Sequence, residues 1–192
     1  DMHKWKSYKN KMVLVTGASS GIGLAMAKEL SERGAHLILV ARSESKLDQA
    51  AIEIRKSGSE AHVFMCDLSM PNSGEKLFKA INAAGLSVDL LINNAGYGRW
   101  GKFTDFERED YAKMIQLNIT TLTDLCHLFI PGMVKKGNGG IINVGSIASF
   151  IPVPYGNVYS SSKAYVLNFT EALRYEYDKK GIQIMTLCPG AT

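Results

Sequence analysis

Short apolar runs rich in β-branched residues alternate along the chain with longer stretches typical of helices, and this alternation constrains the fold most. The runs are short and nearly continuously apolar, which is the pattern of a strand buried on both faces of a sheet. The runs lie at Met12–Val15, Leu37–Val40, His62–Met65, Leu90–Ile92, Ile141–Val144 and Ile182–Leu187. The expected helices lie between them, at 21–33, 44–57, 72–84, 107–136 and 157–180.

This order of elements predicts an α/β protein. Parallel strands joined by right-handed helical crossovers form a doubly wound sheet with helices on both faces. We therefore expect a Rossmann-like three-layer αβα sandwich. No repeat, low-complexity tract or linker divides the 192 residues, so we interpret 1–192 as a single domain.

The composition, 46% apolar and 21% charged, excludes disordered, collagen-like and disulfide-stapled classes. The net charge of +4 comes without a long basic run, so we expect no nucleic-acid partner. Residues 1–11 are polar and charged, and no signal peptide or membrane anchor is evident. Three cysteines without CxxC spacing and four scattered histidines predict a reduced, cytoplasmic protein without a metal site.

A glycine-rich turn follows the first expected strand and opens the first helix. Gly17 suits a tight turn, Gly21 lets the backbone approach a pyrophosphate, and Gly23 allows close helix packing. The helix start presents free N–H groups to an anion. A plain loop with a helix cap is the alternative, but the strand–turn–helix context favours a nucleotide site. The expected cofactor contacts here are Gly17, Ser19, Ser20, Gly21, Ile22 and Gly23.

The second strand ends at Ala41-Arg42-Ser43, where folds that prefer NAD usually carry an acidic residue. Arg42 can pair with a 2′-phosphate in two hydrogen bonds, and Ser43 can donate another. Alternatively, Arg42 is a surface residue and Ser43 caps the next helix. We favour the phosphate interpretation, and therefore NADP(H) over NAD(H). Lys46 is a weaker candidate, interpreted as a solvated helix residue.

Two further strand ends carry polar or small residues. Asp67, followed by Leu68, can accept a hydrogen bond from an adenine amino group or cap the next segment. Asn93-Asn94-Ala95-Gly96 has small residues that permit close approach to a ligand and amides that can bridge strands. A plain turn is the alternative for this tetrapeptide.

Tyr159 and Lys163 are four residues apart on an expected helix and therefore share one face. A phenol with an ordinary pKa of about 10 is a poor acid–base catalyst near pH 7, and a nearby ammonium favours the phenolate. If Tyr159 exchanges a proton with an oxygen of the substrate, Ser146, just after a strand, can form a hydrogen bond with the same oxygen. By itself, a tyrosine and a lysine at this spacing indicate only a surface pair.

Taken in order, these motifs resemble those of short-chain dehydrogenases/reductases, over Lys11 to Thr192. Thr16-Gly17-xxx-Gly21-Ile22-Gly23 is similar to the family's cofactor turn, and Asn93–Gly96 to its structural tetrapeptide. Tyr159 and Lys163 match the catalytic pair, with Ser146 thirteen positions before Tyr159. Asn118 matches the fourth catalytic residue.

The resemblance implies a role for each of these residues. Tyr159 exchanges a proton with the substrate oxygen, and Ser146 orients that oxygen. Lys163 favours the phenolate and holds the nicotinamide ribose, while Asn118 holds a water that links Lys163 to solvent. The nicotinamide is expected beside Pro189 and Gly190. The remaining expected cofactor contacts are Arg42, Ser43, Asp67, Leu68, Asn94, Ala95 and Gly96.

The match departs from the family pattern at the carboxyl end. Family members continue after the Pro-Gly turn with a substrate-covering segment, a helix and a final strand. The family threonine that contacts the cofactor falls four positions after the glycine, beyond Thr192, so we do not assign Thr192 as a ligand.

The resemblance predicts an NADP(H)-dependent oxidoreductase that interconverts a carbonyl and an alcohol, acting as a homodimer or homotetramer. The segments 96–100 and 150–155 suit an apolar substrate, although both can equally be partly buried loops. A nucleotide-binding sensor on the same fold is the alternative, but it would need none of the four catalytic residues. An epimerase or dehydratase is disfavoured, because those relatives carry Gly-x-x-Gly-x-x-Gly and not Gly-x-x-x-Gly-x-Gly.

Overall fold

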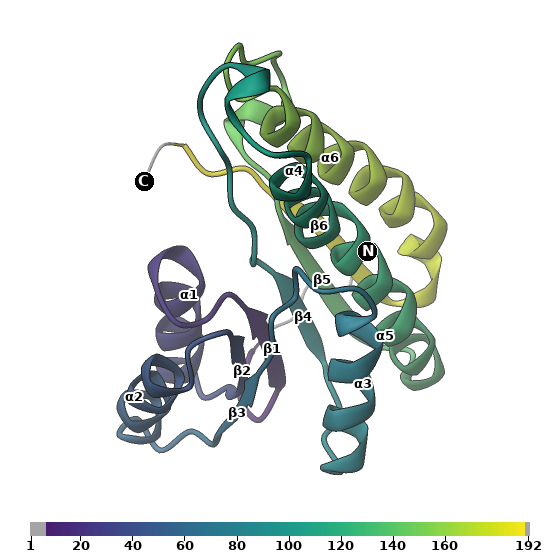
Figure 1. The fold of residues 1–192 in the computed structure, drawn as a ribbon. Helices are drawn as coiled ribbons and strands as arrows, with labels where there is room; N and C mark the ends of the chain where they lie inside the picture. Colours follow the sequence, from purple (N-terminus) through teal and green to yellow (C-terminus); the bar gives the residue numbers. More distant parts are fainter. Residues whose placement is uncertain (1–6, 191–192) are drawn as a thin grey trace.

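The computed structural model describes residues 7–190, which form a sheet of six parallel strands in the order β3-β2-β1-β4-β5-β6 (Figure 1). The order reverses at β1 and β4, which is the point where ligands bind in open α/β sheets. The strands are β1 (Met12–Thr16), β2 (His36–Ala41), β3 (Ala61–Met65), β4 (Leu90–Asn93), β5 (Gly139–Val144) and β6 (Ile182–Leu187).

Helices cover the sheet on both faces, as Figure 1 shows. One face packs against α1 (Gly21–Glu32) and α2 (Glu44–Arg55). The other packs against the helices α3 (Ser73–Ala83), α5 (Leu122–Lys136) and α6 (Asn157–Tyr177), with α4 (Arg108–Ile115) beside α6. The expected three-layer αβα sandwich is confirmed.

The period-two geometry of strands divides the core into two buried clusters, one on each face. In β1, Val13 and Val15 face α1 and α2, whereas Leu14 faces α3, α5 and α6. All three side chains are fully buried. Because neither face of this stretch of β1 meets water, Val13–Val15 form a continuous apolar run.

The expected helix at 107–136 contains a change of winding. The chain passes from α4 through a π-helical segment, Gln116–Thr121, into α5. A wider turn of this kind shifts the side chains relative to a regular helix, and such segments are frequent at functional sites. Asn118, within this segment, is buried.

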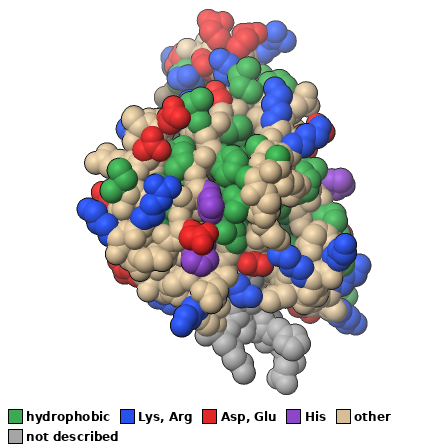
Figure 2. Space-filling model, turned by 90° about the horizontal axis from the view of Figure 1, so that it is seen from below, with side chains coloured by type: hydrophobic (Ala, Val, Ile, Leu, Met, Phe, Trp, Pro, Cys, Tyr) green, Lys and Arg blue, Asp and Glu red, His purple; other side chains and the backbone are tan. Residues whose placement is uncertain are grey.

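Charges on the outer surface are mixed. Over the face shown in Figure 2, basic and acidic side chains are interspersed. Within residues 7–190, no helix combines the length and apolar character needed to cross a membrane. The same residues contain no group of three or more His, Cys, Asp or Glu that could hold a metal ion.

Candidate active site

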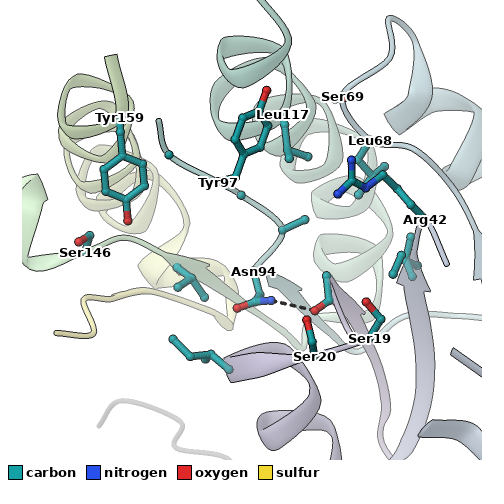
Figure 3. A pocket seen from close by; sticks show the side chains of 18 of the residues that line it. Ser19, Ser20, Arg42, Leu68, Ser69, Asn94, Tyr97, Leu117, Ser146 and Tyr159 are labelled. Carbon is teal, nitrogen blue, oxygen red and sulfur yellow. Dashed lines mark hydrogen bonds between the residues drawn. The ribbon is translucent and has the colours of Figure 1, made fainter. Parts of the chain in front are cut away.

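A cavity of about 590 Å³ opens over the carboxyl ends of the strands (Figure 3). Its walls contain most of the expected site residues: Gly17, Ser19, Ser20, Ile22, Arg42, Ser43, Asp67, Leu68, Asn94, Ala95, Gly96, Ser146, Tyr159, Lys163, Pro189 and Gly190. Gly21, Gly23 and Asn118 do not line it. Residues far apart in the sequence meet here because parallel strands end at the same edge of the sheet.

The glycine turn after β1 is held close to the loop after β4. Gly17 has a φ of 66°, and a Cβ built on it would lie 2.9 Å from Asn94 Nδ2. A Cβ on Gly23 would collide with Asn94 Nδ2 and the Gly17 carbonyl oxygen. Gly23 therefore allows close packing of α1 on the turn, and Ser20 and Ile22 at the start of this helix line the cavity.

The Asn-Asn-Ala-Gly segment bridges β1 and β4. Asn94 Nδ2 donates to the carbonyl oxygens of Thr16 at 3.0 Å and Gly17 at 3.3 Å. The backbone N–H groups of Asn94 and Ala95 each donate to Thr16 Oγ1 at 3.0 Å. These bonds fix the turn against the strand, so the segment is more than a plain turn.

Beneath this segment, a buried chain of polar side chains ties β4 and β5 to α6. Asn93 Nδ2 donates to Asn143 Oδ1 at 2.9 Å. Asn143 Nδ2 in turn donates to Thr170 Oγ1 at 2.9 Å. Since α6 carries Tyr159 and Lys163, these bonds help to hold both residues in place over the sheet.

Charged and polar side chains line the end of the cavity near β2 and β3. Ser43 is the N-cap residue of α2, and its side chain makes no capping hydrogen bond. Lys46 is an exposed residue of α2, in keeping with its interpretation as a solvated helix residue, and it also lines the cavity. Figure 3 shows the Arg42 guanidinium beside Leu68.

Asp67 both orders its own turn and faces the cavity. Its Oδ1 accepts hydrogen bonds from Ser69 Oγ at 2.6 Å and from Ser69 N at 3.0 Å. The Ser69 hydroxyl bond, assisted by the charge of Arg42, lowers the pKa of Asp67 and keeps it ionised. A carboxylate at this position can accept a hydrogen bond from a bound ligand.

Ser146 and Tyr159 line the opposite end of the cavity. In Figure 3 the Tyr159 hydroxyl points toward the Ser146 side chain. Ser146 Oγ accepts from the Ala148 backbone N–H at 3.1 Å, which leaves the hydroxyl proton available for a ligand. Two hydroxyl groups can therefore reach the same substrate oxygen.

Lys163 is buried below Tyr159, with 6% of its surface exposed. Its Nζ donates to the Val144 carbonyl oxygen at 2.8 Å and lies 5.8 Å from the centre of the Tyr159 ring. Burial lowers the pKa of Lys163 to about 8. The ammonium is thus a desolvated charge, close to the phenol and anchored at the end of β5.

Asn118 lies behind the cavity wall. Its Nδ2 donates to the Tyr97 carbonyl oxygen at 2.9 Å and to Ser162 Oγ at 3.0 Å, while Oδ1 accepts from Tyr97 N at 3.2 Å. A Cβ on Gly96 would lie 3.1 Å from Asn118 Oδ1 and 3.3 Å from Lys163 Nζ. Asn118 and Lys163 therefore lie together behind Gly96.

Pro189 and Gly190 close one side of the cavity. The Pro189 carbonyl oxygen accepts from Ile147 N at 3.1 Å, which joins this turn to the segment after Ser146. Thr192 lies outside the described residues.

Of the two apolar segments considered for the substrate pocket, the structure brings only one to the site. Tyr97, Gly98 and Trp100 line the cavity, whereas no residue of 150–155 does. Cys66, Ser69 and Leu117 also line it and were not anticipated. Cys66 and Ser69 flank Asp67, so proximity to a strand end is the signal that would have found them.

Comparison with known proteins identifies the family. The short chain dehydrogenase profile matches residues 11–192, and the chain belongs to this family of oxidoreductases. An uncharacterized oxidoreductase from Staphylococcus epidermidis is 33% identical over 95% of this chain and 78% of the relative. The very-long-chain 3-oxoacyl-CoA reductase of Anas platyrhynchos is 39% identical over 92% of this chain. The fatty acyl-CoA reductase of Acinetobacter baylyi is 38% identical over 95% of this chain. The chain spans 58% and 62% of the lengths of these two reductases.

Solved structures agree on the fold. A short-chain dehydrogenase from Sphingobium yanoikuyae in complex with NADPH is 36% identical, with a TM-score of 0.89 over 95% of this chain and 71% of that one. The bulky-bulky ketone specific alcohol dehydrogenase from Comamonas testosteroni is 31% identical, with a TM-score of 0.89 over 94% of this chain and 73% of that one. An NAD+-bound xylitol dehydrogenase is 28% identical, with a TM-score of 0.87 over 96% of this chain and 72% of that one.

Proposed function

We propose that the protein is an NADP(H)-dependent oxidoreductase that interconverts a carbonyl and an alcohol by hydride transfer, with Tyr159 as general acid and base. One observation carries the proposal. The hydroxyl groups of Tyr159 and Ser146 and the buried ammonium of Lys163 share a cavity that also contains Arg42 and the glycine turn. Proton exchange at one end and anion binding at the other are the two tasks of such an enzyme.

The proton chemistry follows from the positions of the side chains. In reduction, the Tyr159 hydroxyl gives its proton to the substrate carbonyl oxygen, and Ser146 donates a hydrogen bond to the same oxygen. The Lys163 ammonium, 5.8 Å from the ring centre, stabilises the phenolate that remains. In oxidation, the phenolate takes the proton from the alcohol. The nicotinamide, when bound, supplies or accepts the hydride.

Asn118 supports this proton exchange from behind the wall. Both protons of its amide nitrogen are used, by Tyr97 O and Ser162 Oγ. Its Oδ1 accepts one backbone bond and keeps one lone pair. We assign that lone pair to a water that links Lys163 to solvent.

The residues present fit a dinucleotide that carries an additional phosphate. The glycine turn and the start of α1 suit a pyrophosphate, because Gly21 at the start of the helix has open space where a side chain would stand. Arg42, with Ser43 and Lys46, provides donors for a 2′-phosphate at the end of β2. Asp67 and Leu68 would hold the adenine, and Lys163 the nicotinamide ribose, beside Pro189 and Gly190. The NADPH complex of the Sphingobium relative supports this choice over NAD(H).

The substrate is proposed to be a small-molecule carbonyl compound or alcohol of apolar character, in keeping with the bulky-bulky ketone specific alcohol dehydrogenase of Comamonas testosteroni. We also propose a homodimer or homotetramer in the cytoplasm. Light scattering that gives a monomer would contradict the proposed assembly.

Substitution of Tyr159 by phenylalanine tests the mechanism. The variant keeps the ring but lacks the proton donor, so we expect ketone reduction with NADPH to fall by about 10²–10⁴-fold. NADPH binding should be largely retained. Tyr175→Phe is the matched control, because Tyr175 lies on the same helix with 89% of its surface exposed. Full activity in Tyr159→Phe would refute the mechanism, and NADPH binding without turnover by the wild type would favour the sensor.

Removal of the Arg42 guanidinium tests the cofactor preference. In Arg42→Ala we expect the Kd for NADPH to rise at least about tenfold, equivalent to about 1.4 kcal/mol, with little change for NADH. Arg108→Ala, which removes a guanidinium with 92% of its side chain exposed, is the control. Calorimetric titration with each cofactor measures the effect. Equal weakening for NADPH and NADH would show that Arg42 does not bind the phosphate.

A further inference from the structure

Trp100 lies at the cavity beside Tyr159, on a loop whose path depends on two glycines. Gly98 passes against the Tyr159 side chain, where a Cβ would lie 2.9 Å from Tyr159 Cδ2. Gly101 N donates to the Tyr155 carbonyl oxygen at 2.9 Å, which ties the loop to the segment before α6. The loop is therefore anchored on both sides of Trp100.

The indole of Trp100 packs against the start of α6. Its six-membered ring lies over Gly156, where any Cβ would collide with it. The Trp100 and Tyr159 ring centres are 5.6 Å apart, with an angle of 54° between the planes. The position of the indole relative to the proton donor is thus determined by contacts within the chain.

Despite these contacts, more than half of the Trp100 surface is accessible. Trp100 lines the cavity with 59% of its surface exposed. A ligand that covers an exposed aromatic face gains from removal of apolar area from water, at about 25 cal/mol per Å². A flat aromatic group gains a further ring–ring contact.

We propose that Trp100 is a specificity-determining residue, which binds the apolar substituent next to the substrate carbonyl and favours aryl groups. This inference rests on the proposed function, because a carbonyl oxygen held by Tyr159 and Ser146 brings its substituents next to Trp100. Other exposed apolar residues lack this position. Phe150, Ile151 and Tyr155 are 60–64% exposed but do not line the cavity.

Reduction of two ketones tests the assignment. We compare kcat/KM for acetophenone and acetone with NADPH in the wild-type protein, Trp100→Ala and Trp100→Phe. The acetophenone-to-acetone ratio should fall at least about tenfold in Trp100→Ala, and Trp100→Phe should restore most of it. Phe103→Ala is the matched control, because Phe103 is also 59% exposed but stacks on Tyr111 outside the cavity.

A binding measurement separates this inference from the proposed function. Calorimetry of acetophenone with protein saturated with NADP+ should show weaker binding in Trp100→Ala and unchanged binding in Phe103→Ala. Equal losses of kcat/KM for both ketones in Trp100→Ala would overturn the inference. Trp100 would then serve only to hold the Tyr159 side chain in position. Failure of the wild type to reduce either ketone contradicts the proposed function, and the calorimetric comparison then decides the role of Trp100 by itself.

Discussion

At the residue scale, the electrostatics of the site centre on Lys163. Its ammonium is desolvated, and the Val144 carbonyl oxygen is the partner that orients it. Burial lowers the pKa of the group to about 8 from 10.5, so the folded chain releases this proton more easily than the unfolded chain. A desolvated charge interacts more strongly with a nearby phenolate than a solvated one does. The stability that the protein loses by burying Lys163 thus accompanies the catalytic role that we propose for this residue.

This pKa shift predicts a pH dependence of stability. Between about pH 8 and pH 10.5 the unfolded state binds more protons at Lys163, so the free energy of unfolding rises with pH. We expect this contribution to be on the order of 1–3 kcal/mol, and to be absent in Lys163→Met.

Urea unfolding at pH 7.5 and pH 10 measures the difference between the wild type and the variant. Lys79→Met, which removes a lysine with a 72% exposed side chain, is the control. Parallel pH profiles for the wild type and Lys163→Met would show that burial does not penalise the ammonium.

At the scale of elements, the site depends on how closely strands, turns and helices approach one another. α1 starts against the glycine turn because Gly23 has no side chain to separate them. The π-helical segment between α4 and α5 places Asn118 against Tyr97 and Ser162. Regular strands and helices thus bring the site residues to one edge of the sheet. Local irregularities, such as the glycine turn and the π-helical segment, then determine where individual side chains lie.

Two glycine-to-alanine substitutions distinguish close packing from helix propensity. In Gly23→Ala the methyl group meets backbone and the Asn94 amide, so we expect a loss of about 1–3 kcal/mol in stability and weaker NADPH binding. In Gly132→Ala, within α5, no atom lies within 4 Å of the new methyl group. The free energy of unfolding should there rise by about 0.5–1 kcal/mol.

Urea unfolding and NADPH titration check both variants. A Gly23→Ala protein that binds NADPH normally would show that the turn tolerates displacement. A lower free energy of unfolding in Gly132→Ala would contradict the expectation that alanine is favoured over glycine wherever α5 has room for the methyl group.

At the scale of the whole molecule, the sheet assembles one cavity from the ends of all six strands in the described part of the chain. The buried bonds from Asn93 through Asn143 to Thr170 then link the sheet centre to α6. The same sheet therefore positions both Tyr159, for which we propose proton exchange, and Arg42, for which we propose anion binding.

The sequence by itself determined the strands, the helices and the strand-end residues of this protein. A strand buried on both faces is largely apolar, and a close backbone approach at Gly17 and Gly23 requires glycine. Because parallel strands end at one edge, Arg42, Asp67 and Ser146 were predicted to share a site, and the structure brings them to one cavity.

Only the tertiary structure decided where the loop side chains lie. It placed Trp100 against Tyr159, left Phe150 and Tyr155 outside the cavity, and put Asn118 behind its wall. The physical reason is that a side chain on a loop, or on an irregular segment such as the π-helical one that carries Asn118, takes its position from contacts distant in sequence. Gly156 under Trp100 is one such contact, and Ser162 beside Asn118 is another. Local sequence patterns record burial and backbone geometry, and these contacts leave no periodic signal.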